Sequence, residues 1–193
     1  QKARHRKFNN TEYNLEPNIK GCPGGLRDVQ TVGWVAKRHF RAASTLELVA
    51  RGFLTTHEYE ALMRGQDFLW RVRYGLHMLA DRAEDRLLFD YQLQLARMFG
   101  YADDERGLGV EHFMKDYFRC VLKLGVLNEM LTQLFDEAIL RACEPVNLFE
   151  LNNRFRVRND YIEAAHDKVF RNAPYALIEM FTLMAQHDFI VGV

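Results

Sequence analysis

The sequence is poor in the residues that build metal sites and disulfides. It has three cysteines among 193 residues, far apart and without a CxxC spacing, and its seven histidines form neither an HExxH nor an HxH pattern. An odd number of isolated cysteines is typical of a reducing compartment. We therefore expect a cytoplasmic protein without a structural zinc site.

Long apolar runs and net charge are missing as well. No run is long enough to span a membrane, and no apolar signal-peptide region follows the start. The 26 basic residues cancel the 26 acidic ones, so the overall charge points to neither nucleic acid nor a membrane as a partner. The local exception is the basic start QKARHRKF. We interpret it as solvated surface, with contact to a phosphate as the alternative.

Two common nucleotide-binding motifs are absent, because the chain contains neither GxxxxGK(S/T) nor GxGxxG. Its glycine-rich stretch is NIKGCPGGLRD, residues 18–28, which precedes a helical pattern. The plain interpretation is a turn, since Gly24 and Gly25 can adopt backbone angles closed to other residues. The alternative is an anion site, in which backbone N–H groups at the helix N-terminus act together with Lys20 and Arg27.

Apolar residues recur at spacings of three and four over most of the chain, which predicts helices. We expect long helices over 26–40, 57–82 and 112–141, with the apolar stripe of the last one in its core. Several antiparallel helices with short connections are typical of a bundle. In 57–82 the polar residues Gln66, Arg73 and His77 interrupt the stripe, and we interpret them as flanking side chains that reach solvent.

Shorter helices are predicted by their end signals. Ser44 and Glu47 form a capping-box pattern ahead of a helix that ends at Gly52, and Asp90 is the expected N-cap of a helix that ends at Gly100. Pro174 suits the first position of a last helix, which we expect to continue to about residue 187.

A change of pattern near RFRVRNDYIEA predicts a small β-hairpin at about 154–163. Two short runs flank Asn159–Asp160, a dipeptide that tolerates positive φ. The expected fold class is therefore mainly α, an antiparallel helical bundle with a small β-hairpin, preceded by an extended segment.

The line YNLEPNIKGCPGGLRDVQTVGWVAKRHF adds a family resemblance to this pattern. It is similar to the bifunctional PII uridylyltransferase/uridylyl-removing enzymes of bacterial nitrogen control, in which an EPN-K-PGGLRD segment runs into a Trp-containing helix. The stretches GFLT, LWRVRYGLHML, DRLLFDYQLQLA, MKDYFR and LNEMLTQLFDEAIL follow in the family's order and approximate spacing. The resemblance covers nearly the whole chain.

The resemblance implies a place in a larger enzyme. In this family a nucleotidyltransferase domain is followed by a helical domain, an HD hydrolase domain and two ACT domains. The family transfers UMP from UTP to PII when glutamine is low and removes it when glutamine is high. Residues 1–25 would be the C-terminal edge of the transferase domain, with a strand and the glycine-rich loop. Residues 26–193 would be the helical domain.

The resemblance also implies which residues carry chemistry. Nucleotidyl transfer in this class uses Mg²⁺ held by carboxylates. We expect Glu16, at the end of the strand YNLEP, to be a catalytic metal ligand; the alternative is a solvent-facing strand residue. Lys20 and Arg27 would meet the triphosphate, and Gly24 and Gly25 would let the backbone approach it.

Asp28 is assigned to the cap of the helix that follows the loop, so we expect Asp28→Asn to be mild. The family's DxD pair and a complete HD site are both missing from these 193 residues. The isolated chain is therefore expected to be inactive. Two competing hypotheses remain, an interaction module that docks PII or relays the glutamine signal, and a stand-alone helical scaffold.

Overall fold

The computed structural model describes residues 1–8, 11, 13–139 and 147–187. The chain divides into two compact units, Gln1–Arg141 and Ala142–Val193. Each unit has its own cluster of buried hydrophobic side chains, and the two clusters share no residue. No helix in the described ranges is both long and apolar enough to cross a membrane.

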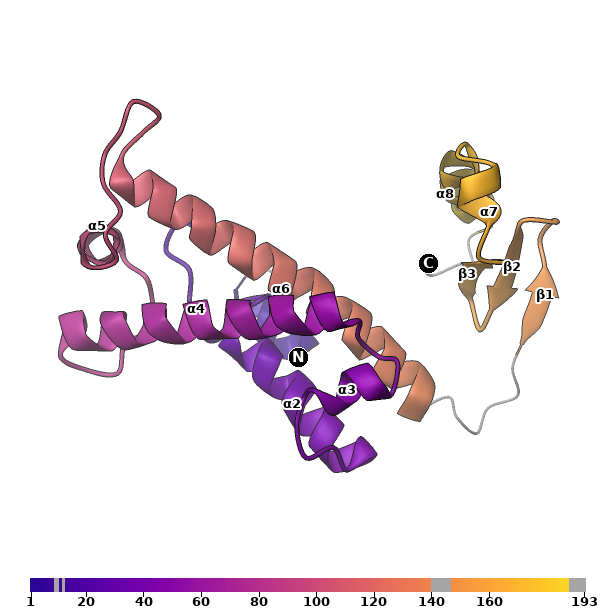
Figure 1. The fold of residues 1–193 in the computed structure, drawn as a ribbon, viewed down its shortest axis with the longest axis horizontal. Coiled ribbons are helices and arrows are strands. Elements are labelled where there is room, and N and C mark those ends of the chain that lie inside the picture. The colour runs from indigo at the N-terminus through magenta and orange to yellow at the C-terminus, as the bar shows by residue number, and fades with distance from the viewer. Residues whose placement is uncertain (9–10, 12, 140–146, 188–193) are drawn as a thin grey trace. The chain divides into compact units, whose positions relative to one another are not determined.

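The first unit is built from helices: α1 (Lys2–Arg6), α2 (Leu26–Phe40), α3 (Glu47–Ala50), α4 (Thr56–Ala80), α5 (Phe89–Met98) and α6 (Gly109–Ile139). The long helix α6 is its centre, because α2, α4 and α5 all pack against it. Figure 1 shows α5 between the separated ends of α4 and α6. The predicted helical bundle is confirmed, with ends that differ by a few residues.

The capping box of this unit lies at α4. Thr55 Oγ1 accepts the Glu58 N–H at 3.2 Å, and a Glu58 carboxylate oxygen accepts the Thr55 N–H at 2.7 Å. Hydrogen bonds from Thr55 hold the pKa of Glu58 below its usual range. The capping box predicted at Ser44 is wrong: α3 begins later, at Glu47, whose side chain accepts the Ala43 N–H at 2.8 Å.

The predicted apolar stripe of α6 is buried. Leu124 and Leu131 expose 1% and 0% of their surface. A Cβ placed on Gly65 of α4 would lie 2.9 Å from the Leu124 side chain, which is closer than normal contact. The missing side chain at Gly65 therefore lets α4 pack closely on α6.

The second unit begins with a three-stranded antiparallel sheet in the order β1 (Leu148–Glu150), β2 (Phe155–Arg158) and β3 (Tyr161–Ala164). The predicted hairpin is β2 with β3, and Asn159 and Asp160 connect them at φ 49° and 70°. Strand β1 was not predicted, because its three residues are too few for an alternating pattern.

Two helices complete the second unit, α7 (Val169–Asn172) and α8 (Ala176–Gln186). Its core consists of Phe155, Val157 and Ile162 from the sheet with side chains of α7 and α8. The last helix begins at Ala176 after Tyr175, so Pro174 lies just before the helix and not at its first position.

The predicted boundary after residue 25 concerns the domains of the whole protein. Residues 1–25 belong to the same compact unit as the helices, and the division falls at Arg141 and Ala142. The membership of residues 1–25 in a transferase domain of the whole protein stays a prediction.

Candidate functional site

The glycine-rich loop is folded back on itself and bonds to the start of α2. The N–H groups of Leu26, Arg27 and Asp28 donate to the carbonyls of Ile19, Lys20 and Gly25 at 3.1, 2.9 and 3.0 Å. The N–H of Gly25 donates to the carbonyl of Cys22 at 3.0 Å, and the N–H of Gly24 donates to Asp28 Oδ2 at 2.8 Å. These N–H groups already have acceptors. The structure does not support the backbone part of the predicted anion site, and anion contact there depends on the side chains of Lys20 and Arg27.

The glycines of the loop serve close packing. Gly24 has φ +69°, and a Cβ on it would lie 2.0 Å from the carbonyl oxygen of Val121 in α6. A Cβ on Gly25 would lie 2.8 Å from the carbonyl oxygen of Ile19. Both glycines are buried. Their contact with a triphosphate stays a prediction, while their packing explains why glycine is required here.

Cys22 is a structural residue of the loop. Its Sγ donates a hydrogen bond to the Asn18 carbonyl at 2.8 Å, and burial raises the pKa of the thiol to about 11. The thiol therefore remains protonated at neutral pH, which makes it a poor nucleophile.

Asp28 connects the loop to the N-terminal helix. Its side chain is buried, accepts the Gly24 N–H, pairs with Arg4 and lies 3.0 Å from His5 Nε2 through either carboxylate oxygen. Arg4 also donates to the carbonyl of Gly21 at 2.7 Å. The role of Asp28 is therefore larger than a helix cap, and the expectation of a mild Asp28→Asn does not fit its burial.

The basic start of the chain is explained by the same contacts. Arg4 and His5 lie on α1 and face the loop, with side chains that are 22% and 18% exposed. Part of the run that was interpreted as solvated surface therefore holds residues 21–28 in place. The sequence shows an acid and a short basic run, but it does not show that Asp28 is buried. The contact between them could therefore not be predicted.

Glu16 lies in a non-helical segment that meets the residues before α5. Arg86 donates to one carboxylate oxygen of Glu16 at 2.9 Å, and the Phe89 N–H donates to the other at 3.3 Å. The predicted strand is reduced to one bridge between Asn18 and Arg86. The N-cap of α5 is Leu88 and not Asp90, which lies inside the first turn, and Glu16 accepts the first N–H of the helix from outside it.

Lys20 belongs to a group of cations around Asp85. Lys20 Nζ lies 4.0 Å and Arg73 Nε 2.6 Å from the carboxylate oxygens of Asp85, and His77 Nε2 is 3.6 Å away. Arg73 and His77 were interpreted as flanking polar residues of α4. The fold instead directs both to one acid, and three basic side chains share a single carboxylate.

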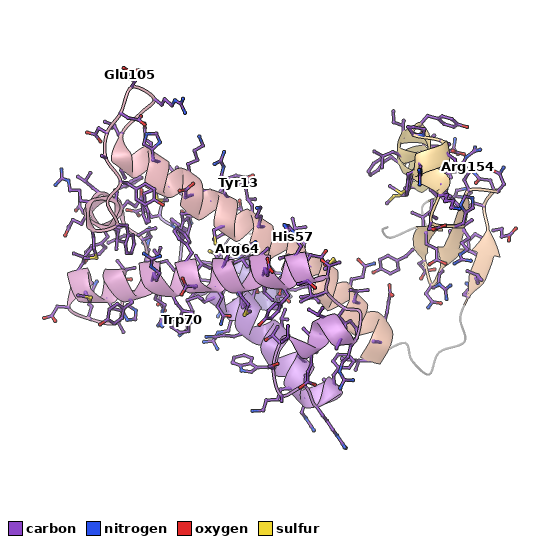
Figure 2. The ribbon with its side chains drawn as sticks, in the orientation of Figure 1. Tyr13, His57, Arg64, Trp70, Glu105 and Arg154 are labelled. Carbon is purple, nitrogen blue, oxygen red and sulfur yellow. The ribbon has the colours of Figure 1, made fainter. Side chains whose placement is uncertain are left out.

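Arg27 lies next to Lys20 through their backbone hydrogen bond, and its guanidinium stands 5.3 Å from the centre of the Trp34 ring. Trp34 is 55% exposed. A second exposed tryptophan, Trp70 on α4, has Arg73 at 5.5 Å and is labelled in Figure 2. The structure therefore brings Lys20 and Arg27 together, and Glu16 lies nearby in sequence but is engaged with Arg86.

The donor set does not form a complete metal site. Within residues 1–8, 11, 13–139 and 147–187, no group of three or more His, Cys, Asp or Glu side chains is arranged to hold a metal ion. Glu16 offers one carboxylate, whose oxygens already bind Arg86 and Phe89. A Mg²⁺ site that uses Glu16 would need further carboxylates from other residues.

Comparison with known proteins gives a consistent result. Residues 1–132 match the family model described as GlnD PII-uridylyltransferase, and residues 155–193 match the one described as uridylyltransferase GlnD third domain. The chain belongs to the GlnD PII-uridylyltransferase family. No solved structure matches it.

Relatives of this family member are named bifunctional uridylyltransferase/uridylyl-removing enzyme. Those of Ectopseudomonas mendocina (strain ymp) and Pseudomonas aeruginosa (strain LESB58) are 54% identical over 193 residues, and that of Stutzerimonas stutzeri (strain A1501) is 50% identical over the same length. In each case the whole chain is covered, but it spans only 21–22% of the relative. The resemblance inferred from the PGGLRD segment is confirmed.

Proposed function

We propose that the protein to which this chain belongs transfers UMP from UTP to the signal protein PII and removes it again in response to glutamine. It would act in the cytoplasm as part of nitrogen regulation. The match of residues 1–132 to a PII-uridylyltransferase family and the names of relatives at 50–54% identity support this proposal. Glutamine would act through regulatory domains outside this chain.

The part assigned to this chain is to complete the nucleotide site with Lys20 and Arg27. The observation that supports this assignment is the bonded loop, which holds the backbones of Lys20 and Arg27 next to each other at the start of α2. Arg27 takes no part in the ion pairs of the described residues, so its charge is available. Both side chains would bind the triphosphate by charge-assisted hydrogen bonds and orient the α-phosphate for attack by the PII acceptor oxygen.

Mg²⁺ belongs to the proposal for the whole protein. When bound, it would neutralise charge that develops on the phosphates. The residues that the structure describes do not fit such a site by themselves, because Glu16 offers a single carboxylate that is already paired with Arg86. The isolated chain is accordingly expected to show no UMP transfer.

Glu16→Gln in the full-length protein tests the ligand role. If Glu16 binds a metal, UMP transfer should fall about 100-fold while uridylyl removal persists. The matched control is Arg86→Gln, which breaks the same ion pair from the other side. Equal effects of the two variants on both activities would show that Glu16 only anchors the segment before α5.

Lys20→Ala and Arg27→Ala test the phosphate contacts. Each removes a charge-assisted contact that is worth about 1.5–3 kcal/mol, so the KM for UTP should rise or turnover should fall. UTP titrations and steady-state kinetics of the full-length variants provide the measurement. Wild-type UTP kinetics in both variants would contradict the nucleotide role of the loop.

The second candidate function is an interaction module that docks PII or regulatory domains. It is favoured by the lack of a complete metal site among the described residues and by the exposed side chains of Trp34 and Trp70. Separate titrations of the full-length protein with UTP and with PII, before and after Arg27→Ala, distinguish the two functions. Only the nucleotide role predicts a change in the UTP titration.

A further inference from the structure

The outer face of α2 carries cations around an exposed aromatic ring. We call this set the α2 stripe: Arg27, Trp34, Lys37, Arg38 and Arg41. Residues four and seven apart in a helix share one face, so Arg27, Trp34 and Arg38 lie in one row. The opposite face of α2 is buried in the core. Trp34 is 55% exposed, and Lys37, Arg38 and Arg41 are exposed as well.

The positive charge of the α2 stripe is not balanced locally. The acidic residue of α2 is Asp28, which is buried on another face and paired with Arg4. Two further acids are engaged elsewhere, since Glu47 pairs with Arg51 and Asp85 with Arg73. The ion pairs of the described residues include no cation of the α2 stripe.

Helix stability accounts for only part of this arrangement. Cations in the last turn, such as Lys37 and Arg38, are favoured by the helix dipole. Arg27 lies in the first turn, where the dipole disfavours a cation, and an exposed Trp34 adds nothing to the core. Tryptophan and arginine are the residue types that most often dominate protein interfaces. The α2 stripe therefore has the composition of a binding surface.

The length of the α2 stripe distinguishes a single nucleotide from a protein segment as its ligand. Eleven positions separate Arg27 from Arg38, about 16 Å along the helix at 1.5 Å per residue. A single nucleotide at Arg27 would leave the far cations without a partner. A protein segment can cover the whole row, and charge complementarity requires that segment to be acidic.

We infer that the α2 stripe docks an acidic segment of the protein that receives the nucleotide, an inference that rests on the proposed function. The stripe begins at Arg27, which is also proposed to contact UTP. A protein bound along α2 would therefore lie next to the nucleotide, where its acceptor oxygen is needed. Complementary charge would also speed its encounter with the enzyme, in a manner weakened by salt.

The test uses the full-length enzyme with PII as the protein substrate. Trp34→Ala and the double variant Lys37→Glu/Arg38→Glu should each raise the KM for PII about tenfold or more. The double variant, which leaves the ring beside Arg27 in place, should also leave the KM for UTP and kcat unchanged. Direct binding of PII should weaken by the same factor. The wild-type affinity should fall as salt increases, and the double variant should lose this salt dependence.

Matched variants keep the test independent of folding. Lys115→Glu reverses an exposed cation on α6 that is not part of the stripe, and should leave the KM for PII unchanged. Arg38→Lys preserves the charge and Trp34→Phe preserves an aromatic ring. Both variants should therefore retain most of the affinity for PII. Thermal unfolding of every variant checks that the fold is intact.

Three results would overturn the inference: an unchanged KM for PII in both stripe variants, an equal rise for Lys115→Glu, or a rise confined to UTP. Competition by a single-stranded RNA oligonucleotide, with PII binding unaffected by the variants, would assign the stripe to nucleic acid and also overturn it. Failure of the proposed function has a separate signature, because the wild-type enzyme would then transfer no UMP to PII.

Discussion

At the scale of single residues, Asp28 joins three pieces of the first unit. Its carboxylate is fully buried and binds the Gly24 N–H, Arg4 and His5. A buried carboxylate is stable only when such partners neutralise and satisfy it. The same contacts keep the loop and α1 in place, so Asp28 positions Lys20 and Arg27 without touching a ligand itself.

Asp28→Asn should therefore lower the free energy of unfolding by about 1–3 kcal/mol, because Arg4 loses its charged partner and the buried hydrogen bonds of the carboxylate are weakened. Urea unfolding of the chain is the measurement. Glu129→Gln, an exposed acid on α6, is the control and should change the free energy by less than about 0.5 kcal/mol. Equal effects of the two substitutions would remove the anchoring role of Asp28.

Gly24 and Gly33 provide a pair of opposite predictions. Gly24→Ala should destabilise by about 3 kcal/mol or more, because its positive φ and the Val121 carbonyl leave no room for a Cβ. Gly33 lies within α2, and a Cβ added to it would have no atom within 4 Å, so Gly33→Ala should stabilise by about 0.5–1 kcal/mol. Urea midpoints that shift in the same direction for both would contradict this account.

At the scale of elements, the contact of α4 with α6 decides the stability of the first unit. Leu124 of α6 fills the space beside Gly65 of α4. Side chains at such a crossing are closely packed, so loss of volume on one helix is coupled to the space left on the other.

Leu124→Ala should cost about 2–5 kcal/mol, whereas Val126→Ala, at a position that is 67% exposed, should cost less than about 1 kcal/mol. Adding Gly65→Ala to Leu124→Ala should recover part of the loss, since the new methyl group occupies the vacated space. A double-mutant cycle on the free energy of unfolding measures this coupling, and strict additivity would argue against the contact.

In the second unit, Glu179 connects α8 to the turn before β2 by hydrogen bonds. Arg154 donates to its two carboxylate oxygens, each at 2.7 Å, and Asn152 donates at 3.0 Å. Arg154, labelled in Figure 2, holds the pKa of Glu179 below its usual range. A lowered carboxylate pKa stabilises the fold above the unfolded-state pKa, and this stability is lost as the pH falls through the folded-state pKa.

The second unit should consequently lose stability below about pH 4.5, the range in which unfolded glutamates take up protons. Glu179→Gln should lower stability at pH 7 and flatten this acid dependence. Thermal unfolding from pH 3 to pH 7 provides the measurement, with Glu150→Gln on the exposed side of β1 as the control. A Glu179→Gln profile parallel to that of the wild type would contradict the prediction.

At the scale of the whole molecule, the chain consists of two units with separate hydrophobic clusters. Residues that share a hydrophobic core tend to unfold together. A substitution that destabilises one cluster should therefore leave the other unit folded. The proposed site lies in the first unit, and residues 155–193 of the second unit match a different family model.

Phe155→Ala removes a fully buried ring from the second cluster and should speed amide hydrogen exchange in residues 147–187. Exchange in α2, α4 and α6 should remain as in the wild type. Mass spectrometry of peptides from both units gives the answer. Faster exchange throughout α6 would show that the two units unfold together.

Much of the fold follows from short-range features of the sequence. The spacing of apolar residues gave α2, α4 and α6, and the Asn159–Asp160 pair gave the β2–β3 hairpin, because helix periodicity and turn chemistry are local properties. The PGGLRD segment, together with the stretches that follow it in the family's order, was sufficient to recognise the family. Strand β1 was missed because three residues are too few for an alternating pattern. The ends of α3 and α5 were missed because they depend on contacts outside their own residues.

The candidate site depends on contacts between distant residues, which no local pattern specifies. Glu16 and Arg86 are 70 positions apart, and Asp28 meets Arg4 across 24 positions. The residue that requires positive φ proved to be Gly24, because α6 passes directly behind it. The sequence by itself determined that a glycine-rich turn with Lys20 and Arg27 precedes a helix. Only the tertiary structure decided that the N–H groups of this turn bond to its own carbonyls and to Asp28, because that outcome depends on how α1 and α6 pack around it.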